Sequence, residues 1–192
     1  MTFLEKVKLF AHNAHDSIGQ TRKYGNKDPY WVHTDEVARI VSLFTKDEDV
    51  IAAAHLHDVL EDVPNVSIID MMLMVGAKHA RVGPLVRELT DIYTSENFPK
   101  LNRKERKTLE AERLGLISND GKLIKLADLF SNTRSIVRHD PGFAKIYLQE
   151  KEKVLYYIRD GLPFKTRILY GLVKLQLWLA KGYLRLFWKN NP

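Results

Sequence analysis

Apolar residues recur at helical spacing along most of this 192-residue chain. In 3–14 they lie three and four positions apart, and the same spacing returns in 37–44, as expected for helices that bury one face. The sequence has no internal repeat and no segment with the apolar–polar alternation that marks a strand. The pattern predicts an all-α protein.

Local signals predict the first loop and the start of the helix that follows 37–44. Residues 19–32 contain too much Gly, Lys and Pro for a helix, so we expect an ordered loop there. The sequence TKDE at 45–48 has the form of a capping box, in which a Thr side chain caps a helix and a Glu three residues later caps the Thr. This predicts one helix that begins there and carries His57 and Asp58.

Glycine and proline mark the remaining boundaries. Gly76 predicts the end of a helix over 67–75, and Pro84 the first residue of the next helix. The sequence NDG at 119–121 predicts a turn, and the sequence PG at 141–142 predicts a break between two helices.

Length and composition limit the kind of protein. The chain is long enough for one domain with a substantial core, and we expect a main domain over 1–162 and a helical extension over 163–192. There is no cysteine, so any metal must be held by His and carboxylate side chains. The N-terminal sequence lacks the apolar core of a signal peptide, and no uncharged apolar run could cross a bilayer, so we expect a cytoplasmic location.

The formal net charge of +6 comes entirely from the end of the chain. All 24 acidic residues and 24 of the 30 basic residues lie in 1–160, which is therefore formally neutral. The other six basic residues lie in 161–192, which has no acidic residue. The charge therefore gives no reason to expect sequence-specific nucleic-acid binding by the protein as a whole.

Two short strings carry the candidate chemistry. His57 and Asp58 stand together in HLHDVLED, and Asp128 stands in the equally apolar KLADLFSN. Charged side chains are rarely placed among core residues unless something compensates them, and a divalent cation can do so. Glu61 and Asp62 follow one helical turn later, where they would share a face with the first pair. This pattern predicts a metal-dependent hydrolase.

The same residues also have a purely structural interpretation. Glu61 and Asp62 could be a solvated helix end, and His57 a hydrogen-bonded core histidine. We favour such an interpretation for His55, which points to another face of the helix. The combined set, with Asp128 elsewhere in the chain, favours a functional site.

The chain resembles the HD-domain phosphohydrolases in several blocks. HLHDVLED is preceded by PYWVH at 29–33 and followed by PKLNRKERK at 99–107 and KLADLFSNTR at 125–134. Within that family it is most similar to the small, stand-alone Rel/Spo-type alarmone hydrolases, from Ala14 to about Gly161. The resemblance implies an HD-domain helical bundle, and the C-terminal amphipathic helix is additional to it.

The resemblance also implies roles for individual residues. The positions that match the family's metal ligands are His33, His57, Asp58 and Asp128. Two imidazoles and two carboxylates suit Mn²⁺ or another divalent ion. Glu61 and Asp62 match the pair that orients and deprotonates the attacking water, and Asn132 matches a position that faces the substrate.

The family's substrate is guanosine with diphosphates on its 5′ and 3′ hydroxyls, that is, guanosine tetra- or pentaphosphate, and the reaction releases pyrophosphate from the 3′ side. Arg22 and Lys23 match the basic pair beside this nucleotide. A second cluster of cations comprises Lys100, Arg103, Lys104, Arg106 and Lys107. Most of these fit an ordinary solvated helix face, and Arg103 and Lys104 are the best candidates for phosphate contacts.

Other functions remain open at this point. The same machinery would serve a phosphatase acting on a 3′- or 2′-phosphate of another nucleotide, a dinucleotide cofactor or an RNA end. A non-catalytic HD module that binds a nucleotide or a partner is a third possibility, which the presence of Glu61 and Asp62 disfavours. Tyr24 and Tyr30 could stack on a base, although packing as buried aromatics is the commoner role.

The extension over 163–192 is basic and strongly apolar. A helix would align Arg167, Lys174, Lys181, Arg185 and Lys189 in one stripe, and nearly all other positions are apolar. So wide an apolar surface must be covered. We expect the helix to fold back on the domain or to pair with a second copy in a homo-oligomer. The alternative is an interfacial helix on a membrane surface, with its cations on anionic lipid.

Overall fold

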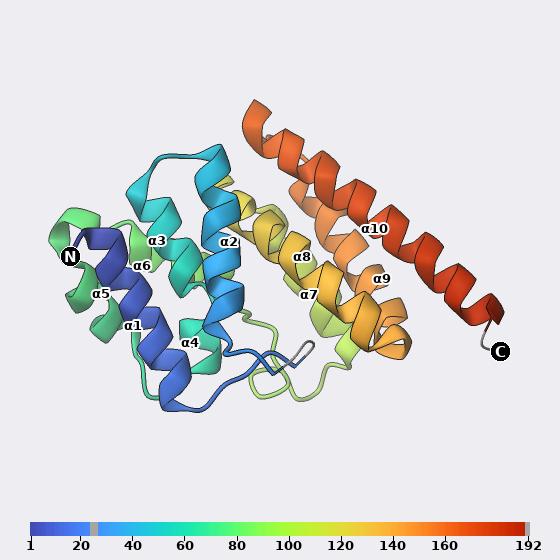
Figure 1. Ribbon diagram of the computed structural model, residues 1–192, viewed down its shortest axis with the longest axis horizontal. Helices are drawn as coiled ribbons and strands as arrows, with labels where there is room; N and C mark the ends of the chain where they lie inside the picture. The colour runs from blue at the N-terminus through green and yellow to red at the C-terminus, as the bar shows by residue number, and fades with distance from the viewer. Residues whose placement is uncertain (24–26, 191–192) are drawn as a thin grey trace.

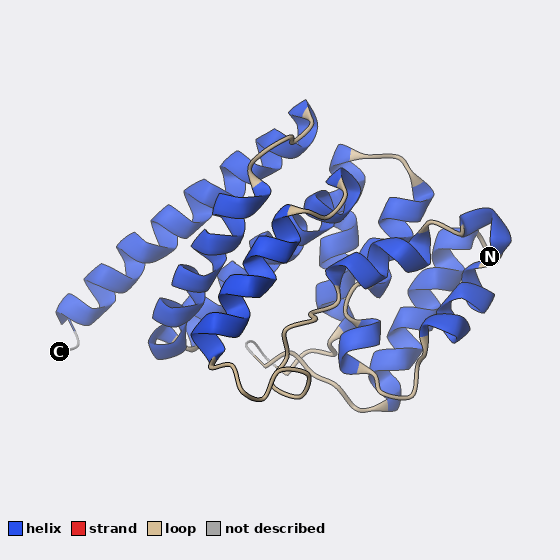
Figure 2. Cartoon of the chain, turned by 180° about the vertical axis from the view of Figure 1, so that it is seen from behind, coloured by secondary structure: helices blue, strands red, loops and turns tan. Residues whose placement is uncertain are grey.

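The structure, a computed structural model, describes residues 1–23 and 27–190, without the side chains of Trp188 and Asn190. The described residues form helices and loops and contain no strand, so the predicted all-α class is confirmed (Figure 2). The helices are α1 (Phe3–Ser17), α2 (Trp31–Phe44), α3 (Glu48–Leu56), α4 (Val59–Asp62), α5 (Ile68–Val75), the 3₁₀ helix η1 (Ala77–His79), α6 (Val82–Leu89), α7 (Arg103–Gly115), α8 (Asn119–His139), α9 (Pro141–Ile158) and α10 (Phe164–Asn190).

Helices α2, α3 and α8 form the centre of the bundle. Each of these three contacts the other two, while α1 and α6 pack on α3 from the side nearer the N-terminus. Helices α7 and α9 pack against each other beside α8, and α10 runs along the outer edge of the molecule against α8 and α9 (Figure 1). Fully buried aliphatic side chains such as Leu56, Leu126 and Leu148 fill the space between these helices. The two HLHDVLED and KLADLFSN strings therefore meet in the interior.

The cap of α3 differs from the predicted capping box. Asp47, not Thr45, is the N-cap, and its carboxylate accepts a hydrogen bond from the N–H of Asp49 at 2.9 Å. The Thr45 hydroxyl accepts instead from the N–H of Asp47 at 3.1 Å. Asp is as good an N-cap as Thr, so the helix begins at the second of two possible positions.

The other boundaries follow the predictions to within a few residues. Gly76 ends α5 with a positive φ of 78°, and 141–142 begin α9 directly after α8, as predicted. Pro84 is the third residue of α6 rather than its first. The sequence NDG at 119–121 is the first turn of α8, because the Ser118 side chain caps the helix just before it.

The extension forms a helix, as predicted, and folds back on the domain. Its buried face consists of Leu169, Val173, Leu177, Ala180 and Leu184. The Gln176 side chain adds a hydrogen bond from its Nε2 to the carbonyl oxygen of Phe130 in α8, at 3.0 Å. Only one face of α10 is covered in this way, so the expectation that its whole apolar surface is buried is met in part. None of the described helices combines the length and apolar character needed to span a bilayer.

Candidate active site

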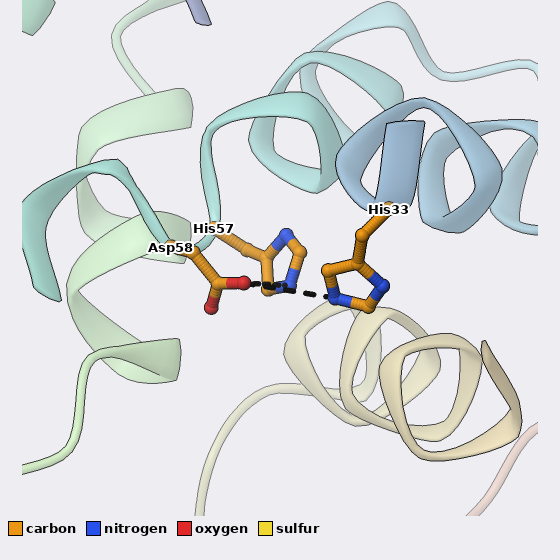
Figure 3. Close-up of side chains that lie close together, drawn as sticks. All are labelled: His33, His57 and Asp58. Atoms are coloured by element: carbon orange, nitrogen blue, oxygen red, sulfur yellow. Dashed lines mark ion pairs between the residues drawn. The ribbon is translucent and has the colours of Figure 1, made fainter. Parts of the chain in front are cut away.

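His57 and Asp58 lie at a break between two helices. α3 ends at Leu56 and the short α4 begins at Val59, so the prediction of one helix carrying both residues is wrong. The His57 ring caps the end of α3, since its Nδ1 donates to the carbonyl oxygen of Ala54 at 2.9 Å. A neutral ring that is protonated at Nδ1 has its lone pair on Nε2. That nitrogen faces the interior beside Asp58 (Figure 3).

His33, on α2, is oriented in the same way by a chain of hydrogen bonds. The Ser131 hydroxyl of α8 donates to Glu36 at 2.7 Å, and it therefore accepts from the His33 Nδ1, which is 3.0 Å away. This leaves the His33 Nε2 as the unprotonated nitrogen. Its ring faces that of His57, with the ring centroids 5.3 Å apart (Figure 3).

The side chains of His33, His57 and Asp58 fit a divalent-metal site. One ligand atom from each lies within 4.8 Å of the others. The Nε2 atoms of His57 and His33 are 3.0 and 3.6 Å from the Asp58 Oδ2. Ligands held about 2.1 Å from one ion lie roughly 3.0–3.4 Å apart, which is close to these distances. Both Nε2 atoms are buried without a hydrogen-bond partner among the described residues, as expected of nitrogens that serve a cation.

Asp128 comes to the same point from α8. Its Oδ1 lies 3.3 Å from the His33 Nε2 and 4.0 Å from the His57 Nε2. The same oxygen accepts a hydrogen bond from the Asn132 side chain at 2.6 Å, and Oδ2 lies 2.9 Å from the Lys125 ammonium. The structure thus places Asp128 beside the two imidazoles, while His33, His57 and Asp58 form the group whose ligand atoms all lie within 4.8 Å of one another.

The carboxylates of this site are held in their ionised form. Burial alone would raise the pKa of Asp58, but the His57 ring beside it holds that pKa well below its usual range. Burial likewise opposes ionisation of Asp128, and the Lys125 cation lowers its pKa. In return, Asp58 overcomes the effect of burial on His57 and raises the pKa of that ring to about 9. The centre therefore attracts positive charge.

Glu61 and Asp62 have different surroundings. Glu61 lines the cavity described below and accepts a hydrogen bond from the backbone N–H of Asp91 at 3.3 Å. Its surroundings partly desolvate it, although it still reaches solvent, and with the Asp91 carboxylate they raise its pKa to about 7. Asp62 instead accepts from the Gln20 amide at 2.8 Å, and the Gln20 oxygen in turn accepts from His15. Glu61 is thus the freer of the two acceptors.

A cavity of about 190 Å³ opens over the centre between α4, α7, α8 and α9. Polar and charged side chains dominate its wall: Tyr30, Asp58, Glu61, Asp91, Lys107, Glu110, Lys125, Asp128, Asn132, Glu150 and Lys151. The Tyr30 hydroxyl donates to the Asp58 carboxylate at 2.7 Å, so this ring helps to hold Asp58. Tyr24, the other aromatic residue considered for base stacking, lies outside the described residues.

Three lysines reach this cavity. Lys107 pairs with Asp91 at 2.6 Å, and Lys125 pairs with Asp128. Lys151 has no acidic partner within ion-pair distance among the described residues, and its ammonium lies 5.1 Å from the centroid of the Tyr147 ring. Burial and the nearby Lys125 lower the pKa of Lys151 to about 8. A polyanion entering the cavity would meet all three cations.

The predicted phosphate-binding residues lie farther out. Arg22 bonds to Ser135 at 3.2 Å and Arg103 to Glu150 at 2.8 and 3.0 Å, and neither lines the cavity. Lys23 and Arg103 both lie over the Phe143 ring, at 5.6 and 5.4 Å from its centroid, so the first loop and α7 converge there.

Lys104, one of the two preferred candidates, is exposed and does not line the cavity either. Within the cluster at 100–107 the structure places only Lys107 in the cavity wall. Lys125 could have been found from the sequence, since it begins the KLADLFSN string three residues before Asp128. Lys151 stands in no motif, and no local pattern in the sequence points to it.

Comparison with known proteins identifies the family. The family model described as "HD domain" matches residues 9–154. The chain is 36% identical over 155 residues to guanosine-3′,5′-bis(diphosphate) 3′-pyrophosphohydrolase MESH1 of Xenopus tropicalis, covering 79% of this chain and 81% of the relative. It is 37% identical over 158 residues to the Homo sapiens protein of the same name, covering 81% and 83%.

Solved structures agree with this relationship. The chain matches, with a TM-score of 0.74 and 30% identity, the structure described as "A metazoan ortholog of SpoT hydrolyzes ppGpp and plays a role in starvation responses", covering 92% of this chain and 96% of that one. A Listeria monocytogenes structure, lmo0812, shares the fold with a TM-score of 0.64 at 21% identity over 83% of this chain and 99% of that one. The chain therefore belongs to the HD-domain family, in the group that includes the MESH1 proteins.

Proposed function

We propose that this protein hydrolyses guanosine 3′,5′-bis(diphosphate) and releases the 3′-pyrophosphate, with a divalent ion, Mn²⁺ as the first candidate, held by His33, His57, Asp58 and Asp128. The observation that carries the proposal is a pair of buried imidazole nitrogens, without a hydrogen-bond partner among the described residues, that face two carboxylates beneath a lysine-lined cavity. Relatives named for this activity, which match about four fifths of the chain, support the choice of substrate. Because the proposed substrate is a nucleotide, we also propose that the protein acts in the cytoplasm.

In this proposal the four ligand residues form a binding site for the ion that is already in place before the ion arrives. A bound divalent ion would supply Lewis acidity at the reacting phosphate. Glu36 and Ser131 keep the His33 Nε2 turned toward the centre, and Ala54 does the same for His57.

Glu61 is assigned to take the proton from the attacking water. It lines the cavity from α4, three residues after Asp58, and its carboxylate is not neutralised by a basic partner within ion-pair distance among the described residues. A base with a pKa near the working pH is the most effective. Asp62 is assigned to orient the water or to hold the His15–Gln20 pair in place. Its hydrogen bond to Gln20 restrains the Asp62 carboxylate, which suits a positioning role.

The lysines are assigned to the phosphates. Lys125 and Lys107 already balance carboxylates, so Lys151 is the cation most available to the departing pyrophosphate. Asn132, which is both in the cavity wall and bonded to Asp128, can donate to a substrate oxygen. Arg22, Lys23, Arg103 and Lys104 remain candidates for the outer part of the nucleotide, where Lys23 and Arg103 converge on Phe143.

The test is an assay with guanosine 3′,5′-bis(diphosphate) that distinguishes pyrophosphate from phosphate. We expect pyrophosphate release that stops with a chelator and returns with Mn²⁺. Asp58→Asn and Asp128→Asn should lose both metal binding and turnover. Glu61→Gln should bind metal and substrate but lose turnover on the order of 10²–10⁴-fold, the usual contribution of a general base.

Each failure points to another function. Release of phosphate from a dinucleotide or an RNA end, with the guanosine substrate untouched, would assign the phosphatase alternative. Nucleotide binding without turnover of any of these compounds would assign the non-catalytic alternative. Parent-level turnover in Glu61→Gln would move the role of base to another group.

A further inference from the structure

The face of α10 that points away from the domain carries exposed large apolar side chains from Phe164 to Leu186. Its exposed large side chains are Phe164, Ile168, Leu172, Leu175, Trp178, Leu179, Tyr183 and Leu186. They follow the spacing of three and four residues that places side chains on one side of a helix. Trp178 is 69% exposed and Phe164 77% exposed. A continuous surface of this kind is the mark of an interaction site.

A row of cations flanks this apolar face. Lys174, Lys181 and Arg185 line two adjoining hollows of about 350 and 470 Å³ between α9 and α10, together with Lys145 and Arg159 of the α9 side. Glu152, which pairs with Lys181, is the one acidic residue that the described part of the chain places in the walls of these two hollows. The chain after Asp160 has no acidic residue at all. The partner that suits this surface is therefore apolar at its centre and anionic at its edge.

We propose that α10 binds the protein to the surface of an anionic lipid bilayer. The helix, about 40 Å long at 1.5 Å per residue, would lie in the plane of the interface. Its outer face would rest among the acyl chains near the headgroups, and the lysines and arginines would contact the lipid phosphates. The opposite face of the same helix stays packed on α8 and α9.

Charge favours lipid over a second copy of the chain. In an antiparallel pair of α10 helices related by a twofold axis, the two cation rows would lie on the same side of the pair. No acidic residue of α10 could compensate them, because 161–192 contains none. An anionic bilayer complements both the apolar face and the cations.

The test uses the full-length protein and co-sedimentation with two kinds of vesicle, phosphatidylcholine alone and phosphatidylcholine mixed with phosphatidylglycerol. We expect binding to the mixed vesicles and none to the neutral ones. Binding should weaken when the ionic strength rises from about 0.1 M to about 1 M, which shortens the screening length from about 10 Å to about 3 Å. The Trp178 emission should shift to shorter wavelength on binding, and Trp178→Phe should remove that part of the shift.

Two sets of variants separate the apolar and the ionic contributions. Trp178→Ser with Leu179→Ser should abolish binding. Lys174→Gln with Arg185→Gln should lower partitioning into mixed vesicles roughly 25-fold, at roughly fivefold for each cation near an anionic surface. Lys46→Gln with Lys78→Gln removes the same charge from exposed lysines outside α9 and α10 and should change little. Circular dichroism would show that each variant keeps its fold.

Several results would overturn the proposal. They are no binding to mixed vesicles, equal binding to neutral vesicles, or equal loss in the Lys46 and Lys78 control. A stable dimer in light scattering that Trp178→Ser with Leu179→Ser dissociates, without vesicle binding by the parent, would assign the surface to a second copy instead.

Discussion

The orientation of His33 depends on a serine that does not itself face the cavity. Ser131 accepts from the imidazole and donates to Glu36, so one hydroxyl decides which ring nitrogen carries the proton. The sequence places Ser131 inside the KLADLFSN string, but nothing in that string shows that it meets a residue 98 positions earlier.

Ser131→Ala should weaken metal binding by roughly 10- to 100-fold, because the ring loses the partner that fixes its tautomer and direction. Calorimetric titration with Mn²⁺ measures this directly. Ser42→Ala is the matched control, since the Ser42 hydroxyl donates to the Arg39 carbonyl oxygen of its own helix, at the end of α2 away from His33. Equal Mn²⁺ affinity in the parent and Ser131→Ala would contradict the role of the serine.

Deprotonation of Lys151 should lower kcat/KM at alkaline pH. Its pKa is lowered to about 8, so the ammonium is present below that pH and is lost as the pH rises through it. Because kcat/KM reports groups of the free enzyme, we expect it to fall above about pH 8. Lys151→Met should lower kcat/KM below pH 8 by roughly 10- to 100-fold, the usual effect of a lost hydrogen bond to a charged group.

Lys151→Arg is the control for this prediction, since a guanidinium stays charged over the whole range. It should remove the fall above pH 8 that the parent shows. If Lys151→Met kept the full alkaline fall, another group would be responsible for it.

At the scale of the elements, the sequence predicted the ligand candidates better than the segments that hold them. The motif residues His33, His57, Asp58 and Asp128 do meet, but the break after Leu56 was not visible, because 50–62 has the composition of a continuous helix. The break depends on the His57 ring and on packing in the interior, which override local propensity.

The sequence does not show which lysines line the cavity, and the reason is a different one. Which side of α7 faces the cavity depends on how that helix packs against α9, so Lys107 lines the wall while Lys104 is exposed. Lys151 reaches the cavity only because α9 returns along α7 and α8. Contacts of this range leave no local pattern in the sequence.

The contact of α7 with α9 permits a test at this scale. A Cβ on Gly115 would lie 2.9 Å from the carbonyl oxygen of Tyr157, and backbone cannot move aside easily. Gly115→Ala should therefore lower the free energy of unfolding by about 1–3 kcal/mol, measured by urea denaturation. Gly171→Ala, on α10 with nothing within 4 Å of the new Cβ, should raise it by up to about 1 kcal/mol. Equal effects of the two changes on the free energy of unfolding would contradict the close approach of α7 to the backbone of Tyr157.

At the scale of the whole molecule, α10 packs along one side of the domain. It covers the side of α8 that faces away from α2, and α8 carries Asp128 and Asn132. The division at 162–163 expected from the sequence thus separates the blocks that resemble the family from a helix that packs against α8 and α9. The division into a main domain over 1–162 and an extension over 163–192 stays a prediction.

Leu177→Ala should lower the free energy of unfolding by roughly 2–5 kcal/mol, because it leaves a cavity against α8 and α9. Leu175→Ala, half exposed on the opposite face of α10, should stay within about 0.5 kcal/mol of the parent. Chemical denaturation without vesicles measures both. A large loss in Leu175→Ala would mean that the outer face is already covered in solution.

The candidate ligands come from three separate stretches of chain: α2, the α3–α4 junction and α8. An ion seated among them would act as a reversible cross-link between positions far apart in the sequence. Because such an ion binds only the folded chain, a free concentration one hundred times its dissociation constant adds about 2.7 kcal/mol of stability. Withdrawing it with a chelator should therefore quicken hydrogen exchange first where these three stretches meet, and only later along α10.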